Sequence, residues 1–140
     1  MDAMILSKGS LVRGKIVLVN VRGYEGRQRE GIWYIGRGCH GWKGSGLRND
    51  FVIGKDGDRK QVIEKYRVWL NEIVRKVLHH EKLSVREMEA WFELKEIKEK
   101  VENGEIIRLG CWCYPEKCHG EIIRRGVLYL MGAYERRWLA

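Results

Sequence analysis

The sequence predicts an α/β domain with a central, largely parallel sheet of about four strands, flanked by about three helices. The main observation is that short apolar runs rich in β-branched residues alternate with longer segments whose apolar residues keep helical spacing. The length of 140 residues is that of one domain with a substantial core of its own. We therefore expect a single domain over residues 1–140, with a mixed sheet as the alternative to a parallel one.

Three strands are predicted in the first half of the chain. Residues 16–19 form a β-branched apolar run between glycines, and residues 32–35 and 51–53 are further short apolar runs. Six glycines within residues 31–46 predict an irregular loop, because glycine disfavours regular elements. The bare backbone amides of such a loop can approach a ligand closely.

Two consecutive helices are predicted after these strands. Residues 62–77 carry apolar side chains at helical spacing over four turns, and Asp58 is a suitable N-cap before them. Ser84 and Glu87 match a capping box, and helical spacing then continues to a stop near Asn103.

A fourth strand and a third helix complete the prediction. Residues 106–113 are the strand, and apolar residues keep helical spacing from about residue 120 to Tyr134. Strands that alternate with helices favour parallel pairing, and ligands of parallel sheets bind beyond the carboxyl ends of the strands.

The positive charge of the chain lies near these strand ends. Basic residues exceed acidic ones by eight, and the excess is in residues 1–55 and 106–140. It indicates either a solubilising surface or an electropositive pocket for phosphate, nucleotide or nucleic acid. Arg22 and Arg37 follow predicted strands, and a guanidinium can hold phosphate through two hydrogen bonds. We predict these arginines as anion clamps, with surface salt bridges as the alternative.

The chain shows no features of a membrane or secreted protein. No apolar run reaches the roughly 18 residues that span a bilayer, and the N-terminus lacks the pattern of a signal peptide. A cytoplasmic protein is expected, or one of the host cytoplasm if its source is viral. The high charge content and the absence of threonine favour a heat-adapted source.

The most informative segment is residues 111–119, which hold three of the four cysteines, one of the four histidines and the only proline. Cys111, Cys113, Cys118 and His119 could bind zinc as three thiolates and an imidazole. Alternatively, Cys118 is a thiol with a lowered pKa at a helix N-terminus, with His119 as its base, and both are catalytic. A third interpretation makes the cysteines small buried hydrophobic residues and His119 a cap-like hydrogen-bond partner of the backbone.

Other residues near this segment are less specific. Cys39 and His40 could complete a metal site, pair with a cysteine of the segment 111–119, or be ordinary loop residues. Trp33, Trp42 and Trp112 lie near the predicted site and could stack on a base.

Several strings of the sequence resemble a known family. They are Asn20-Val21-Arg22, Tyr34-Ile35-Gly36-Arg37, Leu47-Arg48-Asn49-Asp50-Phe51, Ile53-Gly54-Lys55-Asp56-Gly57-Asp58-Arg59, Tyr66-Arg67-Val68-Trp69-Leu70, Cys111-Trp112-Cys113-Tyr114-Pro115 and Cys118-His119-Gly120-Glu121. In this order and spacing they resemble the domain-of-unknown-function family DUF4326 of prokaryotes and their viruses. The chain departs from the family pattern at Arg48 and Asp50, where glycine and proline are usual, and Cys39-His40 lies outside the pattern.

This resemblance implies an α/β fold and a set of pocket residues but no reaction. The residues carried over are Arg22, Gly36, Arg37, Asn49, Arg59, Tyr66, Cys111, Cys113, Cys118 and His119. The function predicted first is binding of a phosphate-bearing or nucleotide-like small molecule, with its chemical transformation as an extension of that role. The alternative is a basic nucleic-acid-binding module with a structural zinc, and a third hypothesis is an interaction protein without chemistry.

Overall fold

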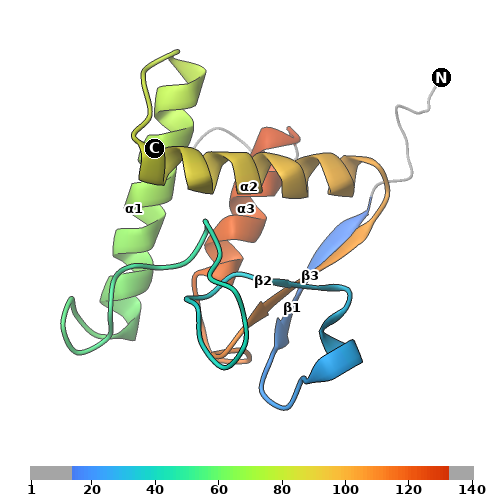
Figure 1. Ribbon diagram of the computed structural model, residues 1–140. Coiled ribbons are helices and arrows are strands. Elements are labelled where there is room, and N and C mark those ends of the chain that lie inside the picture. Colours follow the sequence, from blue (N-terminus) through green and yellow to red (C-terminus); the bar gives the residue numbers. More distant parts are fainter. Residues whose placement is uncertain (1–13, 133–140) are drawn as a thin grey trace.

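The computed structural model describes residues 14–132. Its strands are β1 (Lys15–Asn20), β2 (Ile32–Tyr34) and β3 (Ile106–Cys111), its α-helices are α1 (Arg59–Leu78), α2 (Val85–Glu102) and α3 (Gly120–Leu130), and a short 3-10 helix, η1, spans Gly26–Arg29. Figure 1 shows these elements in chain order. The predicted α/β class is confirmed.

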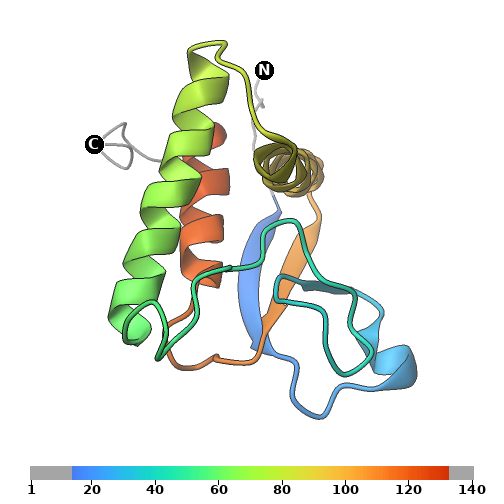
Figure 2. The ribbon, with the colours of Figure 1, turned by 60° about the vertical axis from the view of Figure 1, so that its left-hand side comes forward.

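The three strands form a parallel sheet in the order β1-β3-β2. In the register of this sheet, Asn20 at the end of β1 is opposite Cys111, and Tyr34 at the end of β2 is opposite Gly110. All three strands therefore end at one edge. The loops that follow them gather at the lower end of the molecule in Figure 2.

The predicted strand at residues 51–53 is not formed, so the described sheet has three strands and not four. The amide of Val52 donates to the Asp56 carboxylate at 2.8 Å, and its carbonyl accepts from the Asp56 amide at 2.8 Å. Because a local turn uses these backbone groups, only an isolated bridge between Ile53 and Gly57 remains. Gly54, at φ 93°, supplies the left-handed conformation of that turn.

Other predicted boundaries shift slightly. The last strand ends at Cys111 instead of residue 113, because the chain turns there into the loop of residues 112–119, here called the cysteine-rich loop. The last helix ends at Leu130, and Tyr134, where it was predicted to end, lies outside the described residues.

The starts of α1 and α2 follow the sequence prediction. Asp58 and Gln61 form a capping box at α1, and Ser84 and Glu87 form one at α2. In each capping box, the N-cap side chain accepts a hydrogen bond from the backbone amide three residues later, and the side chain of that later residue accepts one from the N-cap amide. Within the described part of the chain, none of the helices has the length and apolar character needed to cross a membrane.

The helices share one core with the sheet. Figures 1 and 2 show α1 and α3 side by side and α2 crossing them near the strand beginnings, while α3 also packs on β1 and β3. The fully buried side chains at the centre of this core are Leu70, Ile73, Val74, Leu94, Ile97, Val101, Leu109, Ile123 and Val127. Both α1 and α3 begin at the end of the molecule where the strands finish (Figure 2). Two helix N-termini and three strand ends thus surround the same loops.

Candidate functional site at the carboxyl edge of the sheet

A pocket of about 580 Å³ lies at this edge. Its lining includes eight of the ten residues carried over from the family resemblance: Gly36, Arg37, Asn49, Arg59, Cys111, Cys113, Cys118 and His119. They come from four separate stretches of the chain, which the parallel sheet and the two helix starts bring together.

The other two predicted residues, Arg22 and Tyr66, do not line this pocket. Arg22 is exposed on the loop after β1. Tyr66 is fully buried in α1, and its ring edge packs on the His119 ring with centroids 4.9 Å apart. Its hydroxyl donates to the Leu47 carbonyl at 2.7 Å. Tyr66 therefore supports the pocket from beneath and cannot touch a ligand in it.

Replacing Tyr66 by phenylalanine is expected to lower the free energy of unfolding by about 1 kcal/mol, because the buried Leu47 carbonyl then loses a hydrogen bond. Tyr114→Phe is the matched control, since Tyr114 is exposed and its hydroxyl bonds no described residue. Urea titration measures both variants. Equal stability of the two would contradict a supporting role for the Tyr66 hydroxyl.

Three basic side chains line the pocket, and two of them have no partner among the residues that the structure describes. Arg37 and Lys117 make no side-chain hydrogen bond or ion pair with any described residue. Arg59, the first residue of α1, is engaged: its guanidinium lies 3.0 Å from a Glu116 carboxylate oxygen and donates to the Lys117 carbonyl at 3.1 Å. Arg59 therefore holds the cysteine-rich loop against α1, and Arg37 and Lys117 are the available cations.

Asn49 and Gly36 shape the pocket instead of presenting polar groups to it. The Asn49 amide donates to the Val62 carbonyl at 3.2 Å, and its oxygen accepts from the Phe51 amide at 2.9 Å. At Gly36, a Cβ atom would lie 2.5 Å from the Tyr34 hydroxyl oxygen, so only glycine fits. That hydroxyl in turn donates to the Arg37 carbonyl at 2.6 Å, which fixes the loop carrying Arg37.

Two cysteines meet at the floor of the pocket. The sulfur atoms of Cys111 and Cys118, both buried, are 3.1 Å apart. The hydrogen bond from the Cys118 thiol, with backbone groups of the loop and the charge of Arg59, lowers the pKa of Cys111 to about 6. The same hydrogen bond, together with burial, raises the pKa of Cys118. This differs from the expectation of a low thiol pKa at Cys118: the helix terminus counts for less than the neighbouring sulfur.

His119 is buried and neutral. Burial lowers its pKa to about 4, because the charged imidazolium is poorly solvated there. Its Nε2 lies 2.7 Å from the Ile35 carbonyl, so this nitrogen carries the proton and donates it. In that tautomer Nδ1 has the free lone pair, which is the form a base requires.

The predicted zinc ligands are only partly assembled. Within residues 14–132, no three Cys, His, Asp or Glu side chains are grouped so that they could hold a metal ion together. Cys111 and Cys118 touch, whereas His119 is bonded to Ile35, and Cys113 interacts with Arg59, where it raises the pKa of the guanidinium.

The Cys39-His40 loop lies against the same wall of the pocket. A bridge between Cys39 and Trp42 closes the loop, and the Cys39 sulfur is 3.5 Å from the Tyr34 hydroxyl oxygen. The His40 ring packs at a tilt on Trp112, with centroids 5.3 Å apart. This places Cys39 at the rim, exposed to solvent, and away from the Cys111–Cys118 contact.

Sequence analysis did not select Asn20 and Lys117. The Asn20 amide donates to the Tyr114 carbonyl at 2.6 Å, so the end of β1 holds the cysteine-rich loop. The sequence feature that could have selected Asn20 is its position at the end of a predicted strand, in the same family string as Arg22. Lys117 lies between matched residues, and only the folded loop turns it to the pocket.

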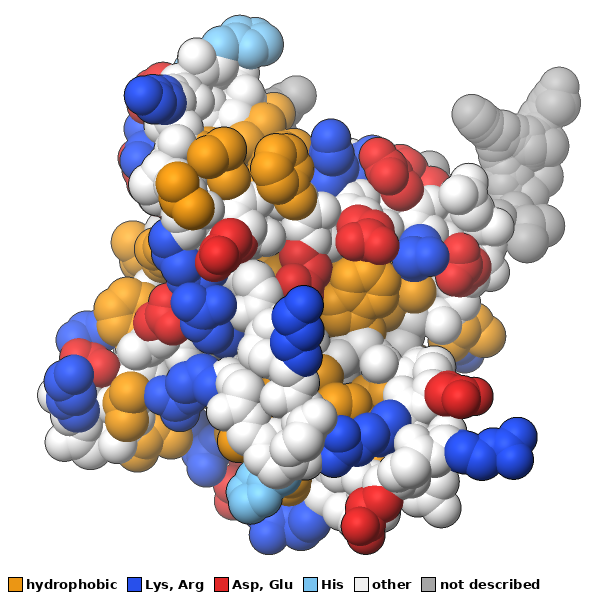
Figure 3. Space-filling view, viewed as in Figure 1, with side chains coloured by type: hydrophobic (Ala, Val, Ile, Leu, Met, Phe, Trp, Pro, Cys, Tyr) orange, Lys and Arg blue, Asp and Glu red, His pale blue; other side chains and the backbone are white. Residues whose placement is uncertain are grey.

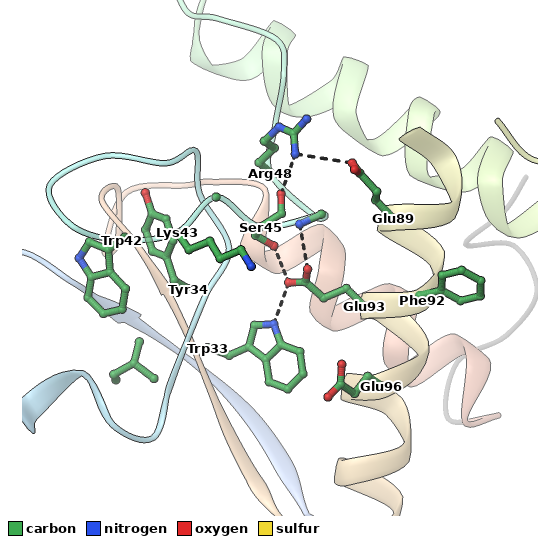
Figure 4. A pocket seen from close by; sticks show the side chains of 13 residues that line it. Trp33, Tyr34, Trp42, Lys43, Ser45, Arg48, Glu89, Phe92, Glu93 and Glu96 are labelled. Carbon is green, nitrogen blue, oxygen red and sulfur yellow. Dashed lines mark hydrogen bonds and ion pairs between the residues drawn. The ribbon is translucent and has the colours of Figure 1, made fainter. Parts of the chain in front are cut away.

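A second pocket of about 690 Å³ lies between α2 and the segment with six glycines at residues 31–46, here called the glycine-rich loop. It holds Trp33 and Trp42, and Figure 4 shows Glu93 at its centre, with its carboxylate accepting from Trp33, Ser45 and Gly46. The described lining of this second pocket has two basic and three acidic side chains. The described lining of the pocket at the carboxyl edge has three basic side chains and no acidic one. The smaller pocket is therefore the one suited to an anion.

Comparison with known proteins identifies the family of this chain. A family model described as a domain of unknown function (DUF4326) matches residues 19–128, from the end of β1 to the last turns of α3. No curated protein and no solved structure matches the chain. This match contains every residue that lines the pocket at the carboxyl edge and covers most of the chain, so the chain is a member of the DUF4326 family.

Proposed function

We propose that the pocket at the carboxyl edge of the sheet binds a phosphate-bearing or nucleotide-like small molecule. The observation that carries this proposal is the charge of the lining: Arg37, Arg59 and Lys117, with no aspartate or glutamate among the described lining residues. Because Arg37 and Lys117 have no partner among residues 14–132, their charges are available to a ligand. Figure 3 shows several Lys and Arg side chains over the loop-bearing lower half of the molecule.

Backbone groups support the same proposal. The amides of Arg37 and Gly38 lie in the lining segment and donate to no described residue. Consecutive free amides beside a guanidinium are suited to phosphate oxygens. The volume of the pocket is also in the range of small-molecule sites, roughly 300–1,000 Å³.

An aromatic and apolar wall suits the rest of a nucleotide-like molecule. Trp112, Tyr34 and Phe51 line the pocket together with Val52 and Ile53. A base can stack on such side chains while its phosphate meets the cations at the rim.

The pocket also contains groups that could act on a bound molecule. Cys111, with its lowered pKa, is the candidate nucleophile, and neutral His119 is the candidate base. These assignments replace Cys118 by Cys111 as the reactive thiol and keep His119 in the role that the sequence suggested.

Nucleic acid is the second candidate ligand. It is favoured by the exposed side chains of Arg22, Arg27 and Lys43, which make no ion pair with the described residues. Binding of an oligonucleotide through many phosphates would fall steeply with salt concentration, whereas binding in a single pocket would not.

Calorimetric titration with adenosine monophosphate, and with adenosine as the uncharged match, tests the proposal. We expect the phosphate to increase affinity and Arg37→Ala or Lys117→Ala to weaken binding of the monophosphate about tenfold, as loss of one charge-assisted contact should. Lys43→Ala is the control, because Lys43 is an exposed cation of the other pocket without a described partner.

Arg37→Ala and Lys117→Ala should leave the affinity for adenosine unchanged. Equal binding of the monophosphate and adenosine, or insensitivity to both substitutions, would overturn the proposal. Tight binding of a single-stranded oligonucleotide with a steep salt dependence would instead support the second candidate.

A further inference from the structure

We propose that Cys111 and Cys118 form a redox-active dithiol, which closes to an intramolecular disulfide when a small anionic disulfide enters the pocket. The proposal goes beyond ligand binding and does not depend on which molecule the pocket holds. It rests on the 3.1 Å separation of the two sulfur atoms, on their burial, and on their place in the pocket lining.

The geometry favours this pair over every other pair of cysteines. A disulfide requires a sulfur–sulfur distance of about 2.05 Å, so the two atoms need to approach by only about 1 Å. Cys111 ends β3, where it pairs with Asn20 of β1, and the Cys118 sulfur accepts a hydrogen bond from the Gly120 amide at 3.3 Å. Both sulfur atoms are therefore held by regular structure.

The other two cysteines are engaged elsewhere. Cys113 interacts with the Arg59 guanidinium and raises its pKa, and the Cys39 sulfur lies 3.5 Å from the Tyr34 hydroxyl oxygen. Neither makes a sulfur–sulfur contact within the described part of the chain. Oxidation should consequently join one specific pair.

The pocket gives a small oxidant access to otherwise buried sulfur. Cys111 and Cys118 are both nearly inaccessible by overall exposure but line the pocket directly. The basic side chains at its rim, Arg37 and Lys117, would attract a disulfide that bears carboxylates. The suitable co-reactant is thus a small, negatively charged disulfide.

The reaction proceeds by two thiol–disulfide exchanges. A thiolate of the pair attacks one sulfur of the small disulfide, forming a mixed disulfide and releasing one thiolate of the co-reactant. The second protein thiol gives its proton to that thiolate and then attacks the protein sulfur of the mixed disulfide, releasing the second small molecule as a thiolate, which takes a proton from solvent. Two protein thiols are oxidised to one disulfide, and the small disulfide is reduced to two thiols.

The test treats the reduced, full-length protein with oxidised glutathione as the probe, then blocks free thiols and maps the cysteines by mass spectrometry. Trypsin cuts after Arg108 and Lys117, and chymotrypsin cuts after Trp112, so the three clustered cysteines fall on separate peptides. We expect a peptide linked through Cys111 and Cys118, with Cys39 and Cys113 still free to react with the blocking reagent.

Two variants sharpen the result. Cys118→Ser should stop the reaction at a mixed disulfide between Cys111 and glutathione, whereas Cys39→Ser should leave the linked peptide unchanged. If Cys118→Ser does not fold, the peptide map of the unmodified protein still decides. Linkage of another pair, or four unreacted thiols, would overturn the proposal. Thiols that react only after a chelator removes bound zinc would also overturn it, in favour of the zinc hypothesis.

Discussion

Replacing Glu93 by alanine is expected to lower the free energy of unfolding by about 3 kcal/mol, because three hydrogen-bond donors lose a charged acceptor at once. Its carboxylate accepts from the Trp33 indole at 2.8 Å, from the Gly46 amide at 2.8 Å and from the Ser45 hydroxyl. These bonds join β2 and the glycine-rich loop to α2 (Figure 4). Water can reach the freed groups only in part, since Ser45 is buried and Trp33 is half-buried.

Glu96→Ala is the matched control for this prediction. Glu96 is the same type of residue, lies about one turn later on α2 and lines the same pocket, but its carboxylate makes no hydrogen bond or ion pair with the described residues. Urea denaturation followed by circular dichroism measures both variants. A loss at Glu93 no larger than that at Glu96 would show that the carboxylate does not hold the loop.

Acidification is expected to destabilise the protein through His119. The pKa of this residue is about 4 in the folded protein, against an ordinary value of 6.5. Below pH 6.5 the unfolded chain therefore takes up a proton that the folded chain does not, and the free energy of unfolding falls as the pH drops. The full loss is about 3 kcal/mol and is reached near the folded pKa.

His119→Gln separates this effect from the others that accompany acidification. Glutamine can still donate to the Ile35 carbonyl but does not titrate, so the variant should lose most of the slope of stability between pH 6.5 and about pH 4.5. His79→Gln, at an exposed position, should keep the slope of the unmodified protein. The groups facing His119 are the Tyr66 ring and the charge of Arg37, and Arg37 keeps its charge throughout this range. Identical slopes in the two variants would contradict the prediction.

Most of the fold follows from contacts between residues close together in the chain. The capping boxes at Asp58 and Ser84 and the helices behind them need only groups within four residues of one another. The edge that carries the pocket was predictable too, since Arg37 and Cys111 come at the ends of strands in an alternating pattern. The strand predicted at residues 51–53 was wrong, because an apolar run of three residues does not show whether a partner strand exists.

The roles of individual side chains were harder to predict. Arg59 and Asn49 line the pocket and also make hydrogen bonds or ion pairs that hold its walls together, whereas Arg37 and Lys117 have no described partner. The residue types are the same in either role. What distinguishes them is whether a carboxylate or carbonyl from another segment lies within reach.

The α/β class, the helix starts and the edge of the sheet where the candidate pocket lies could be predicted from the sequence alone, because spacing, caps and strand-end residues are local features. The folded chain was needed to show that Cys111 meets Cys118 instead of Cys113, and that Glu93 accepts from Trp33, a residue 60 positions away. Such pairings depend on how the sheet and helices pack over long chain separations. Which side chains of the pocket contact one another therefore depends on the fold, although the residues themselves can be identified in the sequence.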